Sequence, residues 1–571
     1  MRNLLPGAAL LLLMTFTACH QTARDHKQDA AKKPVVTEKK VFERPDEASV
    51  PPAPGELKKS ENTYTIQEVT LNGSADESIA EPVQDKEVLL APNTVSDFNT
   101  EGYGHIVENK FQTPQTDPLS TFSIDVDEAS YSNVRRFIES GSVPPAGAVR
   151  IEEMVNYFDY DYPQPQNNQP FEVITEMGDC PWNTSHKLVH IGLQGKTIPL
   201  DNLPASNIVF LVDVSGSMDE PNKLPLVQDA MKLLTDQLRE KDRVAIVVYA
   251  GNAGLVLPST SGAFKTTIKN AISELEAGGS TAGGEGIQLA YKVARENFIA
   301  KGNNRIILAT DGDFNVGASS DDELVRMIEK ERKSGVFLSV LGFGTGNYQD
   351  NKMQQLADKG NGNHSYIDQI SEARKVLISE FGSTLFTIAK DVKIQVEFNP
   401  SKVQAYRLVG YENRMLAAED FNDDTKDAGE LGSGHTVTAL YEIIPVGVAD
   451  SFVRKVDNLK YQQPKSLNVF AESDEVMTIK LRYKEPDGET SQLITKTLRD
   501  IPASQQKTSD NFRFSAAVAE FGLLLRNSEY KQNGTMNQVI SLAETAKGQD
   551  KMGYRKEFIS LVKTATSLAV H

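Results

Sequence analysis

The chain has 571 residues and a formal net charge of −18, with 39% hydrophobic and 24% charged residues. Its excess of acidic residues excludes a general nucleic-acid binder, because neutralising phosphates requires a basic surface. The composition is typical of soluble globular proteins, and the length is sufficient for three or four domains of about 150 residues each.

The amino-terminal segment has the pattern of an export signal. A single positive residue precedes an apolar run over 4–16, which is too short to cross a bilayer as a mature helix. The run is followed by Thr17-Ala18-Cys19 and then His20. Small residues before a cysteine resemble a bacterial lipoprotein signal, in which Cys19 is lipidated; a plain signal peptide is the alternative. By the same resemblance, His20 in place of Asp implies an outer-membrane anchor, so we expect a signal peptide over 1–19 and a lipid-anchored protein of the cell envelope.

The stretch after Cys19 is rich in Lys, Glu, Asp, Pro and Ser and poor in aromatic residues. Such a stretch buries too little apolar surface to offset the entropy of ordering it. We therefore expect residues 20–105 to form a disordered tether. Cys180 is the one other cysteine, and an acylated Cys19 leaves it without a disulfide partner, so we expect a packed thiol.

Residues 106–205 are expected to form an α+β flanking domain. An alternating pattern predicts a strand over 119–127, and a helical spacing follows over 131–138. Asp127 lies between them and has the right type for a helix N-cap. Two further alternating strands are predicted at 171–176 and 187–193.

Residues 206–390 alternate strand and helix signals. Strands are predicted at 208–212, 243–249, 255–257, 305–309 and 336–342, with helices at 224–238, 264–275, 284–298 and 321–333. Buried strands that alternate with helices indicate a parallel sheet covered on both faces. This block is thus predicted to be a doubly wound, mostly parallel α/β domain.

Residues 391–571 return to alternating strands and end in helices. Strands are predicted at 392–398, 403–409, 437–444, 477–483 and 491–498, and helices at 512–525, 534–546 and 554–567. Too few strands lie on either side of the central block to make a stable sheet alone. We expect them to pair into one β-sandwich, with the α/β domain as an insertion and the final helices packed on the sandwich.

Side chains that carry oxygen atoms follow two buried strands of the central block. Another such side chain precedes one of its helices. The first strand runs into a D-x-S-x-S loop, the second ends in an acid, and a glycine-rich segment carries a threonine before a helix. In a parallel sheet such ends gather on one edge. The candidate ligands of a hard divalent cation are Asp213, Ser215, Ser217, Thr281 and Asp311.

The order and context of these five residues resemble the von Willebrand factor type A domain and its metal-ion-dependent adhesion site. The resemblance implies that the three hydroxyls bind the ion directly and that the aspartates act mostly through water. With the runs at 118–127 and 150–158 and Pro181-Trp182-Asn183, the chain is also similar to bacterial envelope lipoproteins that combine this domain with a carboxy-terminal domain of unknown function.

These patterns predict a non-enzymatic lipoprotein that binds a partner protein by its acidic side chain. Mg²⁺ suits a small oxygen site that keeps waters, Mn²⁺ is a close substitute, and Ca²⁺ fits less well. Two alternatives remain open: a structural envelope component that a metal stiffens, and a metal-dependent hydrolase. The hydrolase is disfavoured because the three site segments contain no histidine, and the chain has no H-E-x-x-H or G-x-S-x-G motif.

Overall fold

The computed structural model describes residues 99–166, 169–280, 283–312, 321–380, 386–453, 460, 467–500 and 507–568. All of them belong to one compact unit, Pro92–His571. The expectations for Cys19, for most of the tether and for Thr281 fall outside the described residues. Within the described part, none of the helices has both the length and the apolar character needed to cross a membrane.

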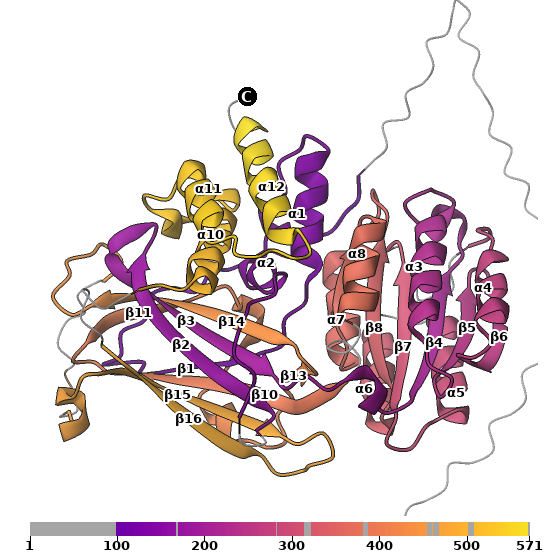
Figure 1. The fold of residues 1–571 in the computed structure, drawn as a ribbon, viewed down its shortest axis with the longest axis horizontal. Coiled ribbons are helices and arrows are strands. Elements are labelled where there is room, and N and C mark those ends of the chain that lie inside the picture. The colour runs from indigo at the N-terminus through magenta and orange to yellow at the C-terminus, as the bar shows by residue number, and fades with distance from the viewer. Residues whose placement is uncertain are drawn as a thin grey trace, which may run out of the picture. The chain divides into compact units, whose positions relative to one another are not determined.

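The central α/β domain is built on one six-stranded sheet (Figure 1). Its strand order is β6-β5-β4-β7-β8-β9, and every neighbouring pair is parallel except β5 with β6. The strands are β4 (Ser206–Asp213), β5 (Arg243–Tyr249), β6 (Ala253–Ser261), β7 (Asn303–Thr310), β8 (Phe337–Phe343) and β9 (His364–Ile367). The predicted doubly wound, mostly parallel sheet is confirmed.

Helices cover both faces of this sheet. Successive strand residues point to opposite faces, so neighbouring residues pack into different cores. Ile208 and Phe210 pack in one core with α3, α4 and α8, whereas Val209 and Leu211 pack in a second core with α5, α6 and α7. The helices are α3 (Leu224–Gln237), α4 (Lys265–Ser273), α5 (Gly283–Glu296), α6 (Asp321–Glu331), α7 (Asp350–Lys359) and α8 (Ile370–Arg374).

The remaining strands form two antiparallel sheets that face each other across a shared apolar core. One sheet has the order β12-β1-β10-β15-β16, with β13 also paired to β10, and the other has the order β11-β14-β3-β2. Their strands are β1 (Leu119–Ser123), β2 (Phe171–Cys180), β3 (Asn183–Gly195), β10 (Thr387–Phe398), β11 (Val403–Val409), β12 (Met415–Leu416), β13 (Gly429–Gly432), β14 (Thr436–Pro445), β15 (Glu475–Lys484) and β16 (Gln492–Arg499).

Strands from before and after the α/β domain pair directly with each other. β1 lies antiparallel to β10, and β3 lies antiparallel to β14. The expectation of an α/β domain inserted in a β-sandwich region is therefore confirmed. The segment 106–205 shares its core with 391–571 instead of having a core of its own.

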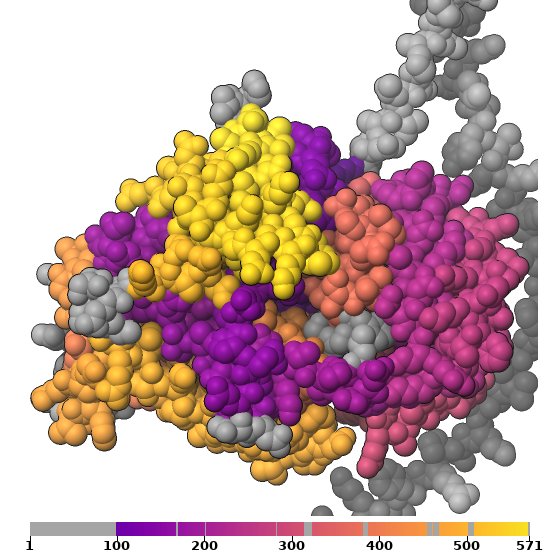
Figure 2. Space-filling view, in the orientation of Figure 1, coloured from indigo at the N-terminus to yellow at the C-terminus, as the bar shows by residue number. Residues whose placement is uncertain are grey.

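The final helices pack on one outer face of the sandwich together with the first helices of the chain. Figure 2 shows the carboxy-terminal segment, in yellow, lying against amino-terminal residues in indigo and purple. The apolar core that they share with Trp182 and Leu188 of the sandwich is continuous. These helices are α1 (Ala129–Glu139), α2 (Ile151–Asn156), α10 (Asp510–Leu525), α11 (Met536–Thr545) and α12 (Tyr554–Leu568).

Asp127 does not cap helix α1. The helix begins at Ala129 with Glu128 as N-cap residue, and that cap makes no side-chain hydrogen bond. Asp127 instead accepts hydrogen bonds from the His364 amide and the Arg414 guanidinium, at 2.7 and 3.0 Å. The buried carboxylate thus joins distant segments, which a local sequence pattern does not reveal.

Candidate metal centre

Strand β4 brings the first three ligand candidates to the side of the central sheet where the parallel strands have their carboxyl ends. All eight of its residues are buried, and it ends at Asp213. The Ser215 amide donates to Asp213 Oδ1 over 2.9 Å, and the hydroxyl oxygens of Ser215 and Ser217 lie 3.1 Å apart. Ser215 precedes a short 3-10 turn but makes no capping bond with its side chain. The two hydroxyls therefore meet without being used to cap the turn.

Asp213 is fully buried and connects the ends of three strands. Its Oδ2 accepts hydrogen bonds from the hydroxyls of Tyr249 at 3.0 Å and Thr310 at 3.1 Å. Burial raises the pKa of Asp213, the hydrogen bonds from Ser215 oppose that rise, and the nearby charge of Asp311 adds to it. With protein donors on both oxygens, Asp213 organises the sheet edge around the two serines.

Asp311 follows strand β7 and is linked to the serine loop through Lys223. The Lys223 ammonium donates to Asp311 Oδ2 over 3.2 Å and to the Ser217 carbonyl over 3.0 Å. Both side chains are buried, at 0% exposure for Asp311 and 4% for Lys223. Asp311 Oδ2 also accepts a hydrogen bond from the side-chain amide of Asn347, at 3.0 Å. The acid predicted to complete the site is therefore joined to the serine loop through a cationic side chain that the sequence did not indicate.

The glycine-rich segment lies against the D-x-S-x-S loop up to the last described residues before Thr281. The Gly216 amide donates to the Gly279 carbonyl over 3.1 Å, and the Gly278 amide donates to the Val214 carbonyl over 2.7 Å. Gly279 has φ +85°, which favours glycine. Four of the five predicted ligands thus lie on connected loops, and Thr281 lies outside the described residues.

Sequence reasoning missed four residues of the centre: Tyr249, Thr310, Lys223 and Asn347. Tyr249 and Thr310 are the last residues of β5 and β7, so the rule that ligands gather at strand ends would have found them. Lys223 and Asn347 lie on loops beyond the strand ends, and no pattern in the sequence marks their contacts with Asp311.

The donor set fits a hard divalent cation, because oxygen is the ligand element such cations prefer. Two hydroxyls and two carboxylates lie on these connected segments. Among the described residues no group of three or more His, Cys, Asp and Glu is placed to hold a metal, so a centre here would depend on hydroxyls. The Lys223 ammonium would compete with a cation for Asp311.

His186, His190 and Cys180 lie outside the centre. His186 contacts Glu442 at 2.6 Å, whereas His190 contacts the Tyr162 hydroxyl at 2.6 Å, so the two rings serve different clusters. Cys180 is fully buried, and burial raises the pKa of its thiol. Its expected role as a packed thiol agrees with this placement.

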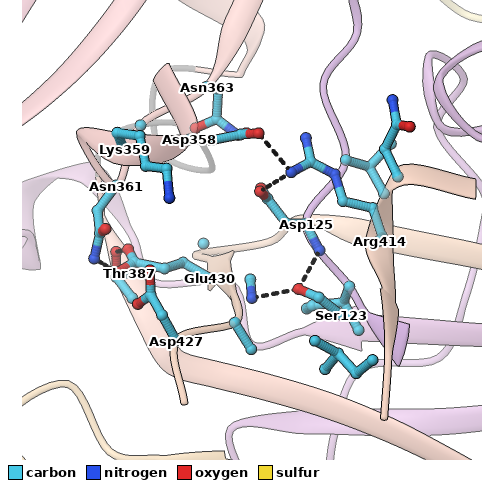
Figure 3. Close-up of a pocket in the computed structure, with 18 of the residues that line it drawn as sticks. Ser123, Asp125, Asp358, Lys359, Asn361, Asn363, Thr387, Arg414, Asp427 and Glu430 are labelled. Carbon is cyan, nitrogen blue, oxygen red and sulfur yellow. Dashed lines mark hydrogen bonds and ion pairs between the residues drawn. The ribbon is translucent and has the colours of Figure 1, made fainter. Parts of the chain in front are cut away.

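A cavity of about 330 Å³ lies elsewhere, and none of the predicted ligands lines it (Figure 3). Its wall includes Arg414, which pairs with Asp125 at 2.9 Å and with Asp358 at 2.8 Å. The Gly429 amide donates to the Ser123 hydroxyl beside them. The cavity differs from the metal centre in position, because no predicted ligand lines it. It also differs in chemistry, because these two carboxylates are ion-paired with Arg414.

Three family models match the chain. The model described as von Willebrand factor type A domain matches residues 207–379, which carry the whole centre. A model described as von Willebrand factor matches residues 97–190, and one described as Uncharacterized protein YfbK, C-terminal, matches residues 383–568. The α/β domain is therefore a von Willebrand factor type A domain.

Relatives share this organisation to different extents. The Uncharacterized protein YfbK of Escherichia coli (strain K12) is 45% identical over 478 residues, which cover 82% of each chain. The Uncharacterized protein sll0103 of Synechocystis sp. is 29% identical over 194 residues, covering 33% of this chain and 44% of the relative.

Solved structures give weaker likenesses. A von Willebrand factor type A structure from Catenulispora acidiphila has a TM-score of 0.39 at 15% identity and covers 68% of this chain and 89% of that chain. Proximal thread matrix protein 1 from the mussel byssus, solved with a zinc occupied MIDAS motif, has a TM-score of 0.26 at 25% identity and covers 31% of this chain and 45% of that chain. TM-scores this low support no transfer of individual residues.

Proposed function

The chain belongs to the family of the Uncharacterized protein YfbK of Escherichia coli, and we propose that its type A domain binds an acidic side chain of a partner protein through a divalent cation. One observation carries the proposal: the hydroxyls of Ser215 and Ser217 meet at 3.1 Å beside Asp213 on the sheet edge that Asp311 also reaches. Loops at such an edge bind ligands while the core is built elsewhere.

Mg²⁺ is the proposed ion, with Mn²⁺ as a close substitute, because the site is small and offers only oxygen. Ser215 and Ser217 would hold the ion, with Thr281 completing the set by resemblance. Bound there, the ion supplies an open coordination position that attracts a carboxylate, since neutral hydroxyls leave much of its charge unneutralised. Asp213 fixes the serine loop, and Asp311 balances the charge of Lys223.

We place the protein in the cell envelope, anchored through a lipid on Cys19 and facing a protein partner at the outer membrane. The support is the sequence alone: a short apolar run that ends in Thr17-Ala18-Cys19 and is followed by His20.

Two other roles are less well supported. A hydrolase requires a general base beside the ion, and the described residues of the centre include no histidine. A purely structural metal would leave the hydroxyls enclosed, whereas Ser217 is partly exposed and Gly216 beside it is exposed. Capture of a partner therefore remains the favoured role.

Affinity capture from envelope extracts tests the proposal. The purified full-length chain is immobilised and compared in Mg²⁺ and in chelator, as wild type and as Ser217→Ala. Ser273→Ala is the matched control, because Ser273 is an exposed serine at the end of α4 in the same domain. We expect partner retention by wild type and control in Mg²⁺ only, and loss in Ser217→Ala. Equal retention in chelator would contradict capture through a metal.

A further inference from the structure

The loop after strand β8 lies against the metal centre. Residues 344–350 comprise this loop and the first residue of α7, and the side-chain amide of Asn347 donates to Asp311 Oδ2 at 3.0 Å. A side chain at Gly312 would lie 2.7 Å from the Gln349 amide nitrogen, so the loop packs directly on the residue that follows Asp311. Gly344 and Gly346 have φ +73° and +91°. Such glycines give a loop backbone freedom, which contacts inside the domain limit: the Tyr366 hydroxyl donates to the Gly344 carbonyl, and Tyr348 is fully buried.

The side-chain oxygen of Asn347 has no hydrogen-bond partner among the described residues. This atom, Oδ1, is buried, although amide oxygens are strong acceptors. A buried, unpaired acceptor costs free energy. Among the described residues the Asn347 side chain thus makes one hydrogen bond, to Asp311, and the position of the loop decides whether that bond forms.

A short segment from the start of the described chain holds the loop on its far side. This segment, residues 99–103, is called the strap here. The Thr100 amide donates to the Gly346 carbonyl over 2.7 Å, the Gly102 amide donates to the Tyr348 carbonyl over 2.9 Å, and the Gln349 side chain donates back to the Thr100 carbonyl over 2.7 Å. Residues that were expected to belong to the disordered tether are thus bound beside the centre.

The strap is itself fixed by a buried ion pair. Glu101 accepts two hydrogen bonds from Arg136 of helix α1, both at 2.8 Å, and only 3% of its side chain is exposed. The same carboxylate accepts from the Gly346 amide at 2.9 Å. Bidentate pairs of this kind hold both partners in one geometry. Helix α1, the strap, the loop and Asp311 therefore form one continuous set of contacts.

We propose that Asn347 is a positioning residue of the metal centre and that the strap sets the cation affinity of the centre by holding Asn347 against Asp311. Lys223 and Asn347 both bind Asp311 Oδ2, which directs the other carboxylate oxygen away from them. When the strap is released, the loop moves, Asp311 rotates more freely and a bound cation loses a fixed neighbour. Releasing the strap therefore weakens cation binding.

Calorimetric titration of the full chain with Mg²⁺ tests this inference, which rests on the proposed metal centre. The variants are Asn347→Ala, Thr100→Val and Glu101→Gln. Thr100→Val is the mildest, because it removes one exposed hydroxyl bond to Gly346 and keeps the side chain shape. The control is Glu397→Gln, which breaks an exposed pair with Lys480 in the sandwich. Hydrogen exchange of 344–350 is measured in chelator for each chain.

We expect Asn347→Ala and Glu101→Gln each to weaken Mg²⁺ binding about fivefold or more, with a smaller effect of Thr100→Val in the same direction. The double variant of Glu101 and Asn347 should bind no more weakly than Asn347→Ala, because the strap acts through that residue. Exchange at 344–350 should rise in both strap variants and not in Glu397→Gln.

Two results would overturn the inference and differ from failure of the proposed function. Unchanged Mg²⁺ affinity in Asn347→Ala would show that the loop does not set affinity. Unchanged affinity in Thr100→Val, together with faster exchange of the loop, would show the same. Additive losses in the double variant would show that the strap does not act through Asn347. A wild-type chain that binds no Mg²⁺ would instead overturn the metal centre itself.

Discussion

Among single residues, Lys223 places a positive charge beside an acid of the proposed metal centre. Its ammonium lies 3.2 Å from Asp311 Oδ2, where it opposes a divalent cation. We expect Lys223→Met to tighten Mg²⁺ binding about tenfold, equivalent to about 1.4 kcal/mol, because the repulsion is removed. In chelator the same variant should melt at a lower temperature, since the buried Asp311 carboxylate then loses its ion pair with the ammonium.

Calorimetry and thermal unfolding check both parts of this prediction. Lys269→Met is the matched control, because Lys269 pairs with Asp236 on the surface of the same domain, where side chains are 36% and 51% exposed. Weaker Mg²⁺ binding by Lys223→Met would mean that the ammonium supports the ion instead of competing with it.

His186 gives the sandwich a pH-dependent stability. Burial acts to lower its pKa, but hydrogen bonds and charges from Glu442 and Asp450 outweigh burial and raise it above the usual value of 6.5. A raised folded-state pKa stabilises the fold fully below the unfolded value and loses that effect as pH rises through the folded value.

We therefore expect the free energy of unfolding of wild type to exceed that of His186→Gln most near about pH 6, with the difference shrinking toward about pH 9. Denaturant titrations of both chains across this range measure it. A difference that stays constant with pH would show that the charged form of His186 contributes nothing.

At the scale of elements, the central domain was predictable because its strands are continuous apolar runs. β4, β7 and β8 lie where such runs occur, and their buried faces alternate between two helix layers. The edge strand was less well predicted: 255–257 was expected and β6 spans Ala253–Ser261. An edge strand is half exposed, so its apolar signal is weak.

Elements whose partners lie far away in sequence were predicted less well. β1 ends at Ser123 although its alternating pattern continues to Asp127, because the later acids turn toward Arg414 and His364. The strap was assigned to the tether for the same reason. Its polar composition gave no sign of the main-chain bonds to Gly346 and Tyr348 that order it.

The way the serine loop is anchored predicts how the domain responds to chelator. Val214 and Met218 pack in one apolar core, and Tyr249 of the other core donates to Asp213, so these contacts do not require an ion. Removing the ion should therefore lower the melting temperature only by the linkage term, which grows with the logarithm of free Mg²⁺ over its dissociation constant, and leave one cooperative transition.

Thermal unfolding in Mg²⁺ and in chelator, followed by circular dichroism, measures this response. A chain that loses its cooperative transition in chelator would support a stiffening role for the metal over partner capture.

At the scale of the whole molecule, buried arginines join segments that are distant in sequence. Arg135 of α1 contacts Asp368 at 2.5 Å, Glu372 at 2.7 Å and Glu557 at 2.8 Å, and so ties the first helix to the α/β domain and to α12. The sequence predicted the insertion from the number of strands on each side. It did not predict these ties, because a single arginine carries no periodic signal.

The proposed lipid anchor at Cys19 can be tested on the whole chain. We expect wild type to incorporate labelled fatty acid and to fractionate with membranes, and Cys19→Ser to appear in the soluble fraction, because a lipid is the expected attachment. Cys180→Ser is the control for loss of a thiol, since Cys180 is buried in the fold. A Cys19→Ser chain that stays with membranes, together with an unlabelled wild type, would contradict lipidation.

The most direct test of the metal centre is Mg²⁺ titration of the full chain with wild type, Ser217→Ala and the exposed control Ser273→Ala. Ser217 is the sharpest probe because its hydroxyl contacts only Ser215 among the bonds in the described structure, whereas Asp213→Ala would also strip acceptors from Tyr249 and Thr310. We expect saturable Mg²⁺ binding by wild type and control, and a loss of affinity of at least about tenfold in Ser217→Ala, equivalent to about 1.4 kcal/mol. Equal Mg²⁺ affinity in all three chains would contradict a centre built on the serine hydroxyls.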